Sequence, residues 1–181
     1  IGEQQKDLEV YAVDTKNIGI GSGFNAIQAA EYIQEGMDWN TLTKTITENI
    51  FKSKVFFVVS TLEYLQKGGR IGLVASMFAN TLNLKPIISC NEDGIYYTVA
   101  KIVGRKRSVK KALELAVAFI GDHSNYNLGI VHGAAEEEAN QIKKYLITQL
   151  PNAKVFVEGQ ISPVLGVHTG PGTIGIVVQK I

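Results

Sequence analysis

The residues in this chain that most clearly suggest chemistry are an arginine and the two glycines before it. Arg70 follows Gly68 and Gly69 directly, and a short helix is expected to end at these glycines. Glycines let the backbone turn sharply and let a ligand approach the main chain closely. A guanidinium beside such a turn is well placed to bind a carboxylate or a phosphate, and the residues alone leave both open. The alternative is a solvent-exposed arginine after a helix end.

A histidine in a stretch rich in glycine and proline is the second candidate. His168 lies between Gly166 and Gly170, in a segment at 163–172 that we expect to form a loop before a strand. An imidazole donates a hydrogen bond or carries a proton near neutral pH. Open backbone next to glycines can also face an anion. The alternative is a turn histidine without a special role.

Positive charge gathers where a helix is expected to begin. Arg105 and Arg107, with lysines at 106, 110 and 111, lead into a helix predicted over 108–120, and Ser108 is its expected N-cap. Cations are mildly unfavourable at a helix N-terminus, so an anion or an acidic partner nearby would explain the cluster. The alternative is a solvated helix start, because charge runs usually face water.

Motifs for several kinds of catalytic or cofactor site are missing from the sequence. The histidines lack the spacing of zinc ligands, and the carboxylates do not form a calcium loop. Walker-lysine and nucleophile-elbow motifs are also missing. The residues therefore favour a binding protein with an anion-facing opening, without metal or cofactor. Two alternatives stay open: a phosphotransferase or hydrolase that uses His168, and a regulatory protein that binds a partner through the basic cluster.

The composition is that of an ordinary globular protein. Of its 181 residues, 45% are hydrophobic and 19% are charged, which is enough for a buried core. The formal net charge of +1 argues against a general nucleic-acid binder, and no apolar run is long enough to span a bilayer. Cys90 is the single cysteine, so an internal disulfide is impossible, and a cytoplasmic setting is the simpler interpretation.

Hydrophobic periodicity and turn residues predict a mixture of strands and helices. Neighbouring strands joined by a tight turn at Asp93-Gly94 favour a mostly antiparallel sheet covered by helices, in an α/β protein with an α+β carboxyl-terminal domain. The expected strands span 8–13, 55–59, 87–89, 95–103, 126–132, 155–157 and 173–178. The expected helices span 24–33, 39–51, a short run ending at 68, 73–82, 108–120 and 135–150.

We expect the chain to divide into two unequal parts. It begins with Ile1 rather than methionine and soon enters the strand expected at 8–13, which suggests a piece of a longer protein. Residues 1–54 are expected to be the tail of a parallel α/β domain. Residues 55–181 are expected to form the domain with the antiparallel sheet.

Four segments of the chain resemble the DegV family, bacterial fatty-acid-binding proteins that present acyl chains to a fatty acid kinase. The resemblance covers essentially the whole chain, without the opening portion of the family. The most specific segment is Thr61-Leu62-Glu63-Tyr64-Leu65-Gln66-Lys67-Gly68-Gly69-Arg70-Ile71. The others are Val13-Asp14-Thr15-Lys16 with Gly21 and Ala29-Ala30, Asn83-Leu84-Lys85-Pro86-Ile87-Ile88 with Asp93-Gly94, and His168-Thr169-Gly170-Pro171-Gly172.

The resemblance implies a two-domain protein that holds one fatty acid between an amino-terminal α/β domain and a carboxyl-terminal domain. The carboxylate would lie near the surface, where a partner kinase converts it to an acyl phosphate. The family's hydroxyl residues that hold this carboxylate would precede Ile1. On the carboxyl-terminal side, Arg70, His168, Thr169 and Gly170 match positions at the head group.

The resemblance also implies an arginine contact near the start of the helix at 108–120. Val103 stands where arginine is common in the family, so the contact with the anion or the partner falls to either Arg105 or Arg107. The implied partners are a long-chain fatty acid and a kinase subunit. Nucleic acid, metal, cofactor and stable membrane insertion are not expected.

Three apolar residues after the Gly-Gly turn are candidates for lining an acyl chain. They are Leu73, Met77 and Phe78, in the helix predicted over 73–82. An ordinary core helix is the alternative, because most apolar helix faces simply pack.

Overall fold

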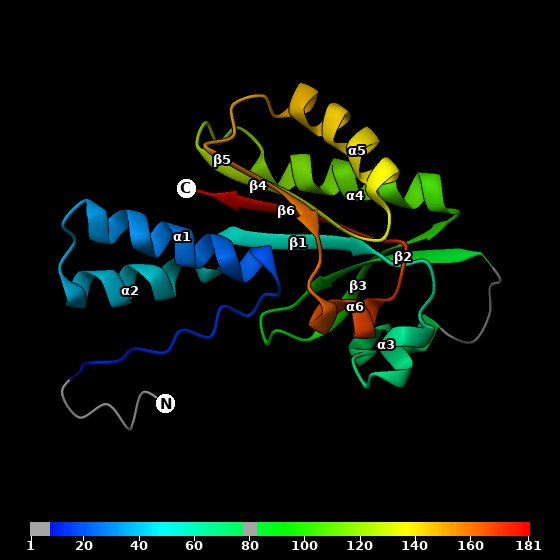
Figure 1. Ribbon diagram of the computed structural model, residues 1–181, viewed down its shortest axis with the longest axis horizontal. Coiled ribbons are helices and arrows are strands. Elements are labelled where there is room, and N and C mark those ends of the chain that lie inside the picture. Colours follow the sequence, from blue (N-terminus) through cyan, green and yellow to red (C-terminus); the bar gives the residue numbers. More distant parts are fainter. Residues whose placement is uncertain (1–7, 78–82) are drawn as a thin grey trace.

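A six-stranded sheet forms the centre of the computed structural model, which describes residues 8–77 and 83–181 (Figure 1). The strand order is β3-β2-β1-β6-β4-β5, and the neighbouring pairs are antiparallel except for β4 and β5. The prediction of a mostly antiparallel sheet is therefore confirmed. The strands are β1 (Ser53–Val58), β2 (Leu84–Cys90), β3 (Tyr96–Val103), β4 (Tyr126–Gly133), β5 (Val155–Gln160) and β6 (Thr173–Lys180).

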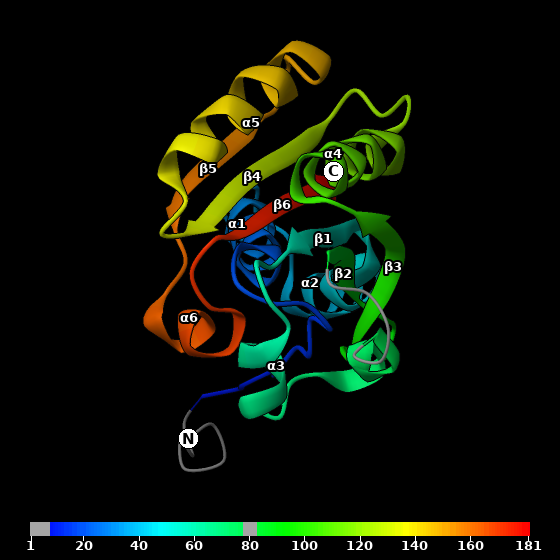
Figure 2. The same cartoon turned by 90° about the vertical axis from the view of Figure 1, so that its right-hand side faces the viewer.

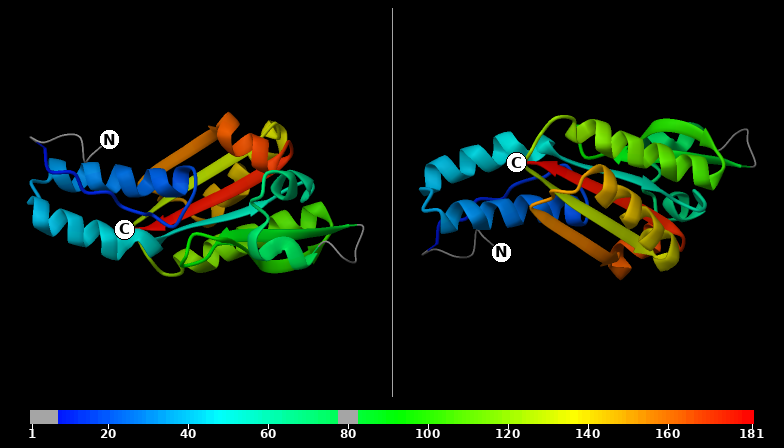
Figure 3. Two further views of the ribbon diagram at one scale, coloured as in Figure 1. Left: turned by 90° about the horizontal axis from the view of Figure 1, so that it is seen from below. Right: turned by 90° about the horizontal axis from the view of Figure 1, so that it is seen from above.

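Helices cover both faces of the sheet (Figures 1 and 2). The helices α4 and α5 lie on one face, and α1, α3 and α6 lie on the other. The helix α2 runs beside α1 at one end of the molecule, as Figure 3 shows. The α-helices are α1 (Ile20–Gln34), α2 (Trp39–Asn49), α3 (Glu63–Lys67), α4 (Arg105–Ile120), α5 (Glu136–Gln149) and α6 (Pro163–Thr169), and 3₁₀ helices span Ile50–Lys52 and Gly72–Met77.

Side-chain alternation along the strands creates a core on each face of the sheet. In β1, Phe56 and Val58 pack in the cluster beneath α4 and α5. Phe57, between them, packs in the opposite cluster with Phe24 of α1 and Leu65 of α3. Successive strand residues point to opposite faces, so a strand buried on both sides appears in the sequence as a continuous apolar run. The apolar run at 55–59 thus becomes a central strand.

The hairpin between β2 and β3 forms where the Asp-Gly pair predicts it. Gly94 has a φ of +78°, which glycine adopts without the steric strain of a side chain. The Asn91 side-chain oxygen accepts hydrogen bonds from the backbone N–H groups of Asp93 and Ile95, at 3.0 and 2.8 Å. Asparagine commonly stabilises turns in this way. The turn lies beside the Gly-Gly-Arg segment, so it helps to shape the surroundings of Arg70.

Two predicted elements near the start and middle of the chain differ in the structure. Residues 8–13 form no strand, and Leu8, Val10 and Tyr11 are exposed. A β-strand needs a neighbour to pair its N–H and C=O groups, and none of the described residues supplies one. The helix predicted over 73–82 is instead the short 3₁₀ helix that ends at Met77, and residues 78–82 lie outside the described part of the chain.

Two predictions of local structure around the candidate site were also wrong. The loop expected at 163–172 contains the helix α6, with Pro163 in its first turn and Gly170, at a φ of +75°, just after its end. Proline and glycine are favoured at these two helix ends, so they mark the limits of a helix here. Gly104 rather than Ser108 is the N-cap of α4. The buried Ser108 hydroxyl instead donates to the Lys85 carbonyl at 2.8 Å.

The helix α1 shares a core with the sheet. Phe24 is fully buried and packs in one cluster with Val55 and Val177. The Ser53 hydroxyl also donates to the carbonyl of Gly21, at 2.9 Å. The domain boundary at 54/55 stays a prediction; it falls within β1, and α1 packs directly on residues of β1 and β6 that lie beyond it.

Two kinds of feature are absent from the described part of the chain. None of the helices there is long and apolar enough to cross a membrane. The same residues include no group of three or more His, Cys, Asp or Glu side chains placed to hold a metal ion.

Candidate functional site

The two segments with candidate chemistry lie side by side, at α3 and α6 (Figure 2). Three glycines make this approach possible, because each occupies a place where a side chain would collide with the other segment. A Cβ on Gly68 would strike the His168 ring, and a Cβ on Gly170 would strike the Tyr64 ring. A Cβ on Gly172 would strike the Ser60 hydroxyl. The Gly-Gly-Arg turn and the His-Thr-Gly-Pro-Gly segment therefore form one continuous surface.

The turn that carries Arg70 is held by three backbone hydrogen bonds at the end of α3. The N–H groups of Gly68, Gly69 and Arg70 donate to carbonyls of the last turn, at 2.9, 3.0 and 2.8 Å. Gly69 has a φ of +67°, and this combination is the Schellman motif that commonly ends a helix. The predicted helix stop at the two glycines is thus confirmed. Arg70 is exposed, and its guanidinium donates to the Gly68 carbonyl at 2.9 Å.

Arg70 lines an open hollow between the Gly-Gly turn and the β2–β3 hairpin. The hollow has a volume of about 280 Å³, and Gly72, Gly94 and Tyr96 are among its other lining residues. Burial raises the pKa of Tyr96 to about 12, and the nearby charge of Arg70 acts in the opposite direction. The hollow therefore presents a guanidinium that can donate hydrogen bonds to an anion, and the phenol of Tyr96 in its wall stays protonated.

His168 lies in the last turn of α6, with one edge of its ring packed against Gly68. The ring Nδ1 is buried and has no hydrogen-bond partner among the described residues. Buried N–H groups without partners are rarer than buried acceptors without partners. The packing therefore favours the tautomer with a proton on Nε2 and none on Nδ1. In that tautomer His168 has one N–H left to donate to a ligand.

Thr169 and Gly170 are both buried, and they connect α6 to β6. The Thr169 hydroxyl donates to the Leu165 carbonyl at 3.0 Å. The carbonyls of both residues accept from the Thr173 hydroxyl, at 3.0 and 2.9 Å. These bonds hold the end of α6, and with it His168, against the start of β6.

A narrow apolar pocket lies between α6 and the sheet, next to the candidate head-group residues. Leu165 and Thr169 line it from α6, and Phe57 and Val177 line it from the sheet. Its exposed lining is apolar, and its volume is about 30 Å³, on the order of one water molecule's share of the liquid. An apolar group can enter here beside Thr169, but a long chain cannot fit inside the pocket.

The predicted chain-lining residues are only partly described. Leu73 is 62% exposed and follows Gly72, which lines the Arg70 hollow. The side chain of Met77 and the whole of Phe78 lie outside what the structure describes. The lining role of these three residues therefore stays a prediction.

The two candidate arginines of the basic cluster have different environments. Arg105 donates to the Glu138 carboxylate, with an Nη2–Oε2 distance of 2.8 Å, and also to two backbone carbonyls. Glu138 lies in the first turn of α5, so the chain itself supplies the acidic partner that the charge cluster predicts. Arg107 is exposed and makes no ion pair with any described residue.

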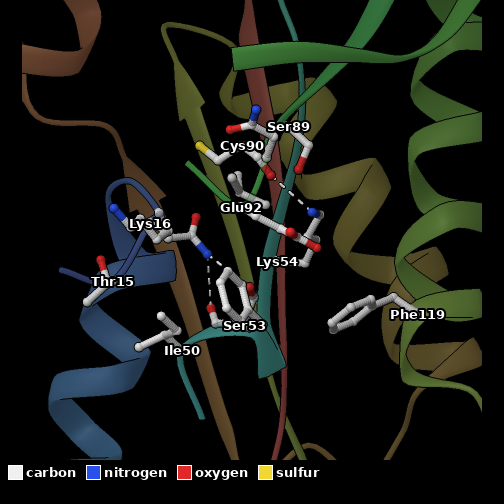
Figure 4. A pocket seen from close by; sticks show the side chains of 13 residues that line it. Thr15, Lys16, Ile50, Ser53, Lys54, Ser89, Cys90, Glu92 and Phe119 are labelled. Atoms are coloured by element: carbon white, nitrogen blue, oxygen red, sulfur yellow. Dashed lines mark hydrogen bonds between the residues drawn. The ribbon is translucent and has the colours of Figure 1, made fainter. Parts of the chain in front are cut away.

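A separate polar pocket lies at the other end of β1, where β1 and β2 separate (Figure 4). Lys54 Nζ donates to the Cys90 carbonyl at 3.0 Å, and the Ser89 hydroxyl is buried without a hydrogen-bond partner in the described part of the chain. The pocket has a volume of about 140 Å³, and none of the predicted site residues lines it. The head-group candidates therefore stay with α3 and α6.

Comparison with known proteins identifies the family. The model described as an uncharacterised protein of the DegV family matches residues 1–180. The chain belongs to the DegV family. A DegV domain-containing protein of Clostridium perfringens is 39% identical over 178 residues, covering 98% of this chain and 63% of the relative. Another, of Clostridium acetobutylicum, is 37% identical over 181 residues, covering 99% of this chain and 64% of the relative. This DegV chain thus spans less than two thirds of their length.

Solved DegV structures share the fold of this chain. The fatty-acid-binding DegV family protein of Streptococcus agalactiae aligns with a TM-score of 0.88 and 25% identity, covering 99% of this chain and 62% of that one. DegV of Bacillus subtilis, a fatty acid binding protein, aligns with a TM-score of 0.87 and 26% identity, covering 99% and 64%. The fold class predicted from the sequence is therefore confirmed.

Sequence reasoning missed several residues around the site of this DegV chain. Tyr64 was part of the most specific motif, but nothing in the sequence places its ring against Gly170. Leu165 was not predicted at the site because its segment was expected to be a loop. The side-chain alternation of β1 did carry a signal for Phe57, because it separates this residue from Phe56 and Val58.

Proposed function

We propose that this DegV protein binds a long-chain fatty acid and presents its carboxylate to a partner fatty acid kinase, which forms the acyl phosphate. The observation that carries the proposal is the contact between the Gly-Gly-Arg turn and His168. The DegV proteins of S. agalactiae and B. subtilis, which are fatty acid binding proteins, support the class of ligand. In this proposal the protein binds and presents the fatty acid, and the kinase catalyses the phosphorylation of its carboxylate.

The carboxylate lies, in this proposal, at the surface formed by α3 and α6. His168 donates from Nε2, and Arg70 supplies positive charge and further hydrogen-bond donors. Thr169 and Gly170 contribute by holding His168 in place, since their polar groups already bond within the chain. Contacts of this kind orient a head group more than they supply affinity.

The acyl chain supplies most of the binding free energy. Each methylene removed from water contributes about 0.8 kcal/mol. We place the first methylenes of the acyl chain, next to the carboxylate, at the apolar pocket under α6. Leu73, Met77 and Phe78 are further candidates for lining the acyl chain. The pocket volume of about 30 Å³ is too small for the rest. The remaining methylenes therefore lie between two domains, with residues 1–54 belonging to the first domain and residues 55–181 forming the second.

The kinase contact falls to Arg107 in this proposal. Its guanidinium is exposed at the start of α4, whereas that of Arg105 is bonded within the chain. An exposed cation can meet an acidic surface of a partner and raise the rate of association. Arg107→Glu should therefore weaken kinase association without changing fatty acid affinity.

The ligand is tested on the full-length protein purified from bacteria. Mass spectrometry should find a co-purifying fatty acid, and added oleate or palmitate should bind. The 181-residue chain should bind about tenfold more weakly or worse, because in this proposal it supplies only part of the surface that encloses the acyl chain. A full-length protein with neither co-purified nor added fatty acid bound would sink the proposal.

The head-group role is tested by separating binding from phosphorylation. Arg70→Ala should lower kinase-dependent phosphorylation more than acyl binding, because the methylenes supply the affinity and the head-group contacts supply the orientation. Lys67→Ala is the control, since it removes an exposed cation of α3 that pairs with Glu63 at 2.6 Å. Equal loss of both activities in Arg70→Ala would contradict the assignment. Acyl phosphate turnover by the protein alone, lost in His168→Ala, would favour an enzyme instead.

A further inference from the structure

We infer that Arg105 is a positioning residue that holds together the two walls of the head-group site, namely the segment that carries Arg70 and the segment that carries His168. The inference rests on the proposed function. Its guanidinium makes hydrogen bonds to three separate segments. Nη1 donates to the Val58 carbonyl at 3.3 Å, and Nη2 donates to the Gly172 carbonyl at 2.5 Å. Nε and Nη2 both donate to the Glu138 carboxylate, at 3.2 and 2.8 Å.

The two carbonyls that Arg105 binds are the points from which the two walls extend. Val58 is the last residue of β1, and the chain continues from it into α3 and the Gly-Gly turn. Gly172 ends the segment that connects α6 to β6, three residues after Thr169. One side chain therefore sets the spacing between the segment that carries Arg70 and the segment that carries His168.

The tolerance for error in this spacing is small. Gly68, Gly170 and Gly172 contact the opposite segment where no side chain would fit, so the two walls are already at their closest approach. A second cation supports the same region, because Lys85 Nζ donates to the Ser60 carbonyl just beyond β1. A small shift of either segment would then misplace the His168 donor relative to a carboxylate.

The charges around Arg105 favour a structural role for its guanidinium over the binding of an external anion. A cation in the first turn of α4 is unfavourable with the helix dipole, whereas Glu138 in the first turn of α5 is favourable. The two side chains are 24% and 33% exposed, so their attraction is less screened than that of a surface pair. The guanidinium is thus already neutralised and bonded by the chain itself.

A lysine cannot replace Arg105 in this role. The planar guanidinium presents several donors in a fixed geometry, whereas an ammonium is a single point charge. Arg105→Lys keeps the charge but loses the simultaneous bonds to Val58, Gly172 and Glu138. The pair Arg105→Met and Arg105→Lys therefore separates positioning from simple attraction of an anion.

The experiment uses the full-length protein and two readouts. One is the dissociation constant for oleate, and the other is the NMR signal of the His168 ring without ligand. Arg105→Met and Arg105→Lys should each weaken oleate binding about tenfold or more and shift the His168 signal. Lys111→Met is the control, because it removes an exposed pair with Glu114 on the same helix, and both readouts should stay unchanged.

The outcomes distinguish the inference from the proposed function. Restoration of both readouts by Arg105→Lys, or an unmoved His168 signal in Arg105→Met, would overturn the positioning role. A wild-type protein that binds neither co-purified nor added fatty acid would overturn the proposed function, while the His168 signal would still test the positioning. If Arg105→Met does not fold, Glu138→Gln removes one charge of the pair and should shift the His168 signal in the same direction by less.

Discussion

Single glycines decide how closely the two walls of the site approach each other. Gly68 has ordinary helical torsions, so its backbone alone would accept any residue. What excludes a side chain there is the His168 ring, which occupies the place of the missing Cβ. Gly166, two residues before His168 on α6, has open space where its Cβ would lie. Gly68 and Gly166 are therefore a matched pair of positions for testing the effect of an added methyl group.

Gly68→Ala should weaken fatty acid binding and lower stability, whereas Gly166→Ala should do neither. The added methyl group at Gly68 must push His168 or α3 aside, and such overpacking typically costs about 1–3 kcal/mol. At Gly166 alanine improves helix propensity, which contributes up to about 1 kcal/mol. Urea unfolding and oleate titration of both variants would check this. Equal behaviour of the two would mean that the walls are not in close contact.

At the scale of elements, the packing of α1 decides how the start of the chain relates to the sheet. Phe24 is fully buried in the cluster that also contains Val55 and Val177. The predicted boundary at 54/55 separates these residues in sequence, although they share one core. Whether the two parts unfold together is therefore a direct test of the domain prediction.

Phe24→Ala should lower the stability of the whole unit by about 3–5 kcal/mol, the usual range for a buried phenylalanine. Ile33→Ala, on the exposed side of α1 at 59% exposure, should change stability little. Trp39 is the single tryptophan, so its fluorescence reports on α2, and circular dichroism reports on all elements. Both probes should show one shared transition. A transition seen by fluorescence alone would favour residues 1–54 as a separate unit.

At the scale of the whole molecule, the burial of two ionisable side chains makes the free energy of unfolding depend on pH in the alkaline range. Burial raises the pKa of the Cys90 thiol from 9.0 to about 11 and that of Tyr96 from 10.0 to about 12. Both groups therefore hold their protons more tightly in the folded protein than in the unfolded chain. Their contribution to stability is complete below about pH 9 and is lost as the pH rises through the folded values.

The free energy of unfolding should fall between about pH 9 and about pH 11, and Cys90→Ala should reduce that fall. The variant also removes buried atoms at every pH, so the comparison concerns the slope and not the absolute stability. Urea unfolding at several pH values would measure both slopes. Identical slopes in the wild type and Cys90→Ala would show that the thiol does not contribute.

Local patterns in the sequence were enough for most of the fold. The helix stop at Gly68-Gly69 and the hairpin at Asp93-Gly94 were predicted, because glycine torsions and turn chemistry act over a few neighbouring residues. The same local reasoning failed at 163–172, since proline and glycine mark both loops and helix ends. It also failed at 8–13, because a strand depends on a distant partner.

The sequence by itself determined the family, the antiparallel sheet and the types of residue at the site. Only the tertiary structure decided that Gly68 packs on His168, that Arg105 is bonded within the chain and that Arg107 is exposed. Residue types and spacing carry information about local torsions and about which faces are apolar. Contacts between segments about a hundred residues apart depend on how the sheet brings these segments together. No local sequence pattern indicates which distant segments will come into contact.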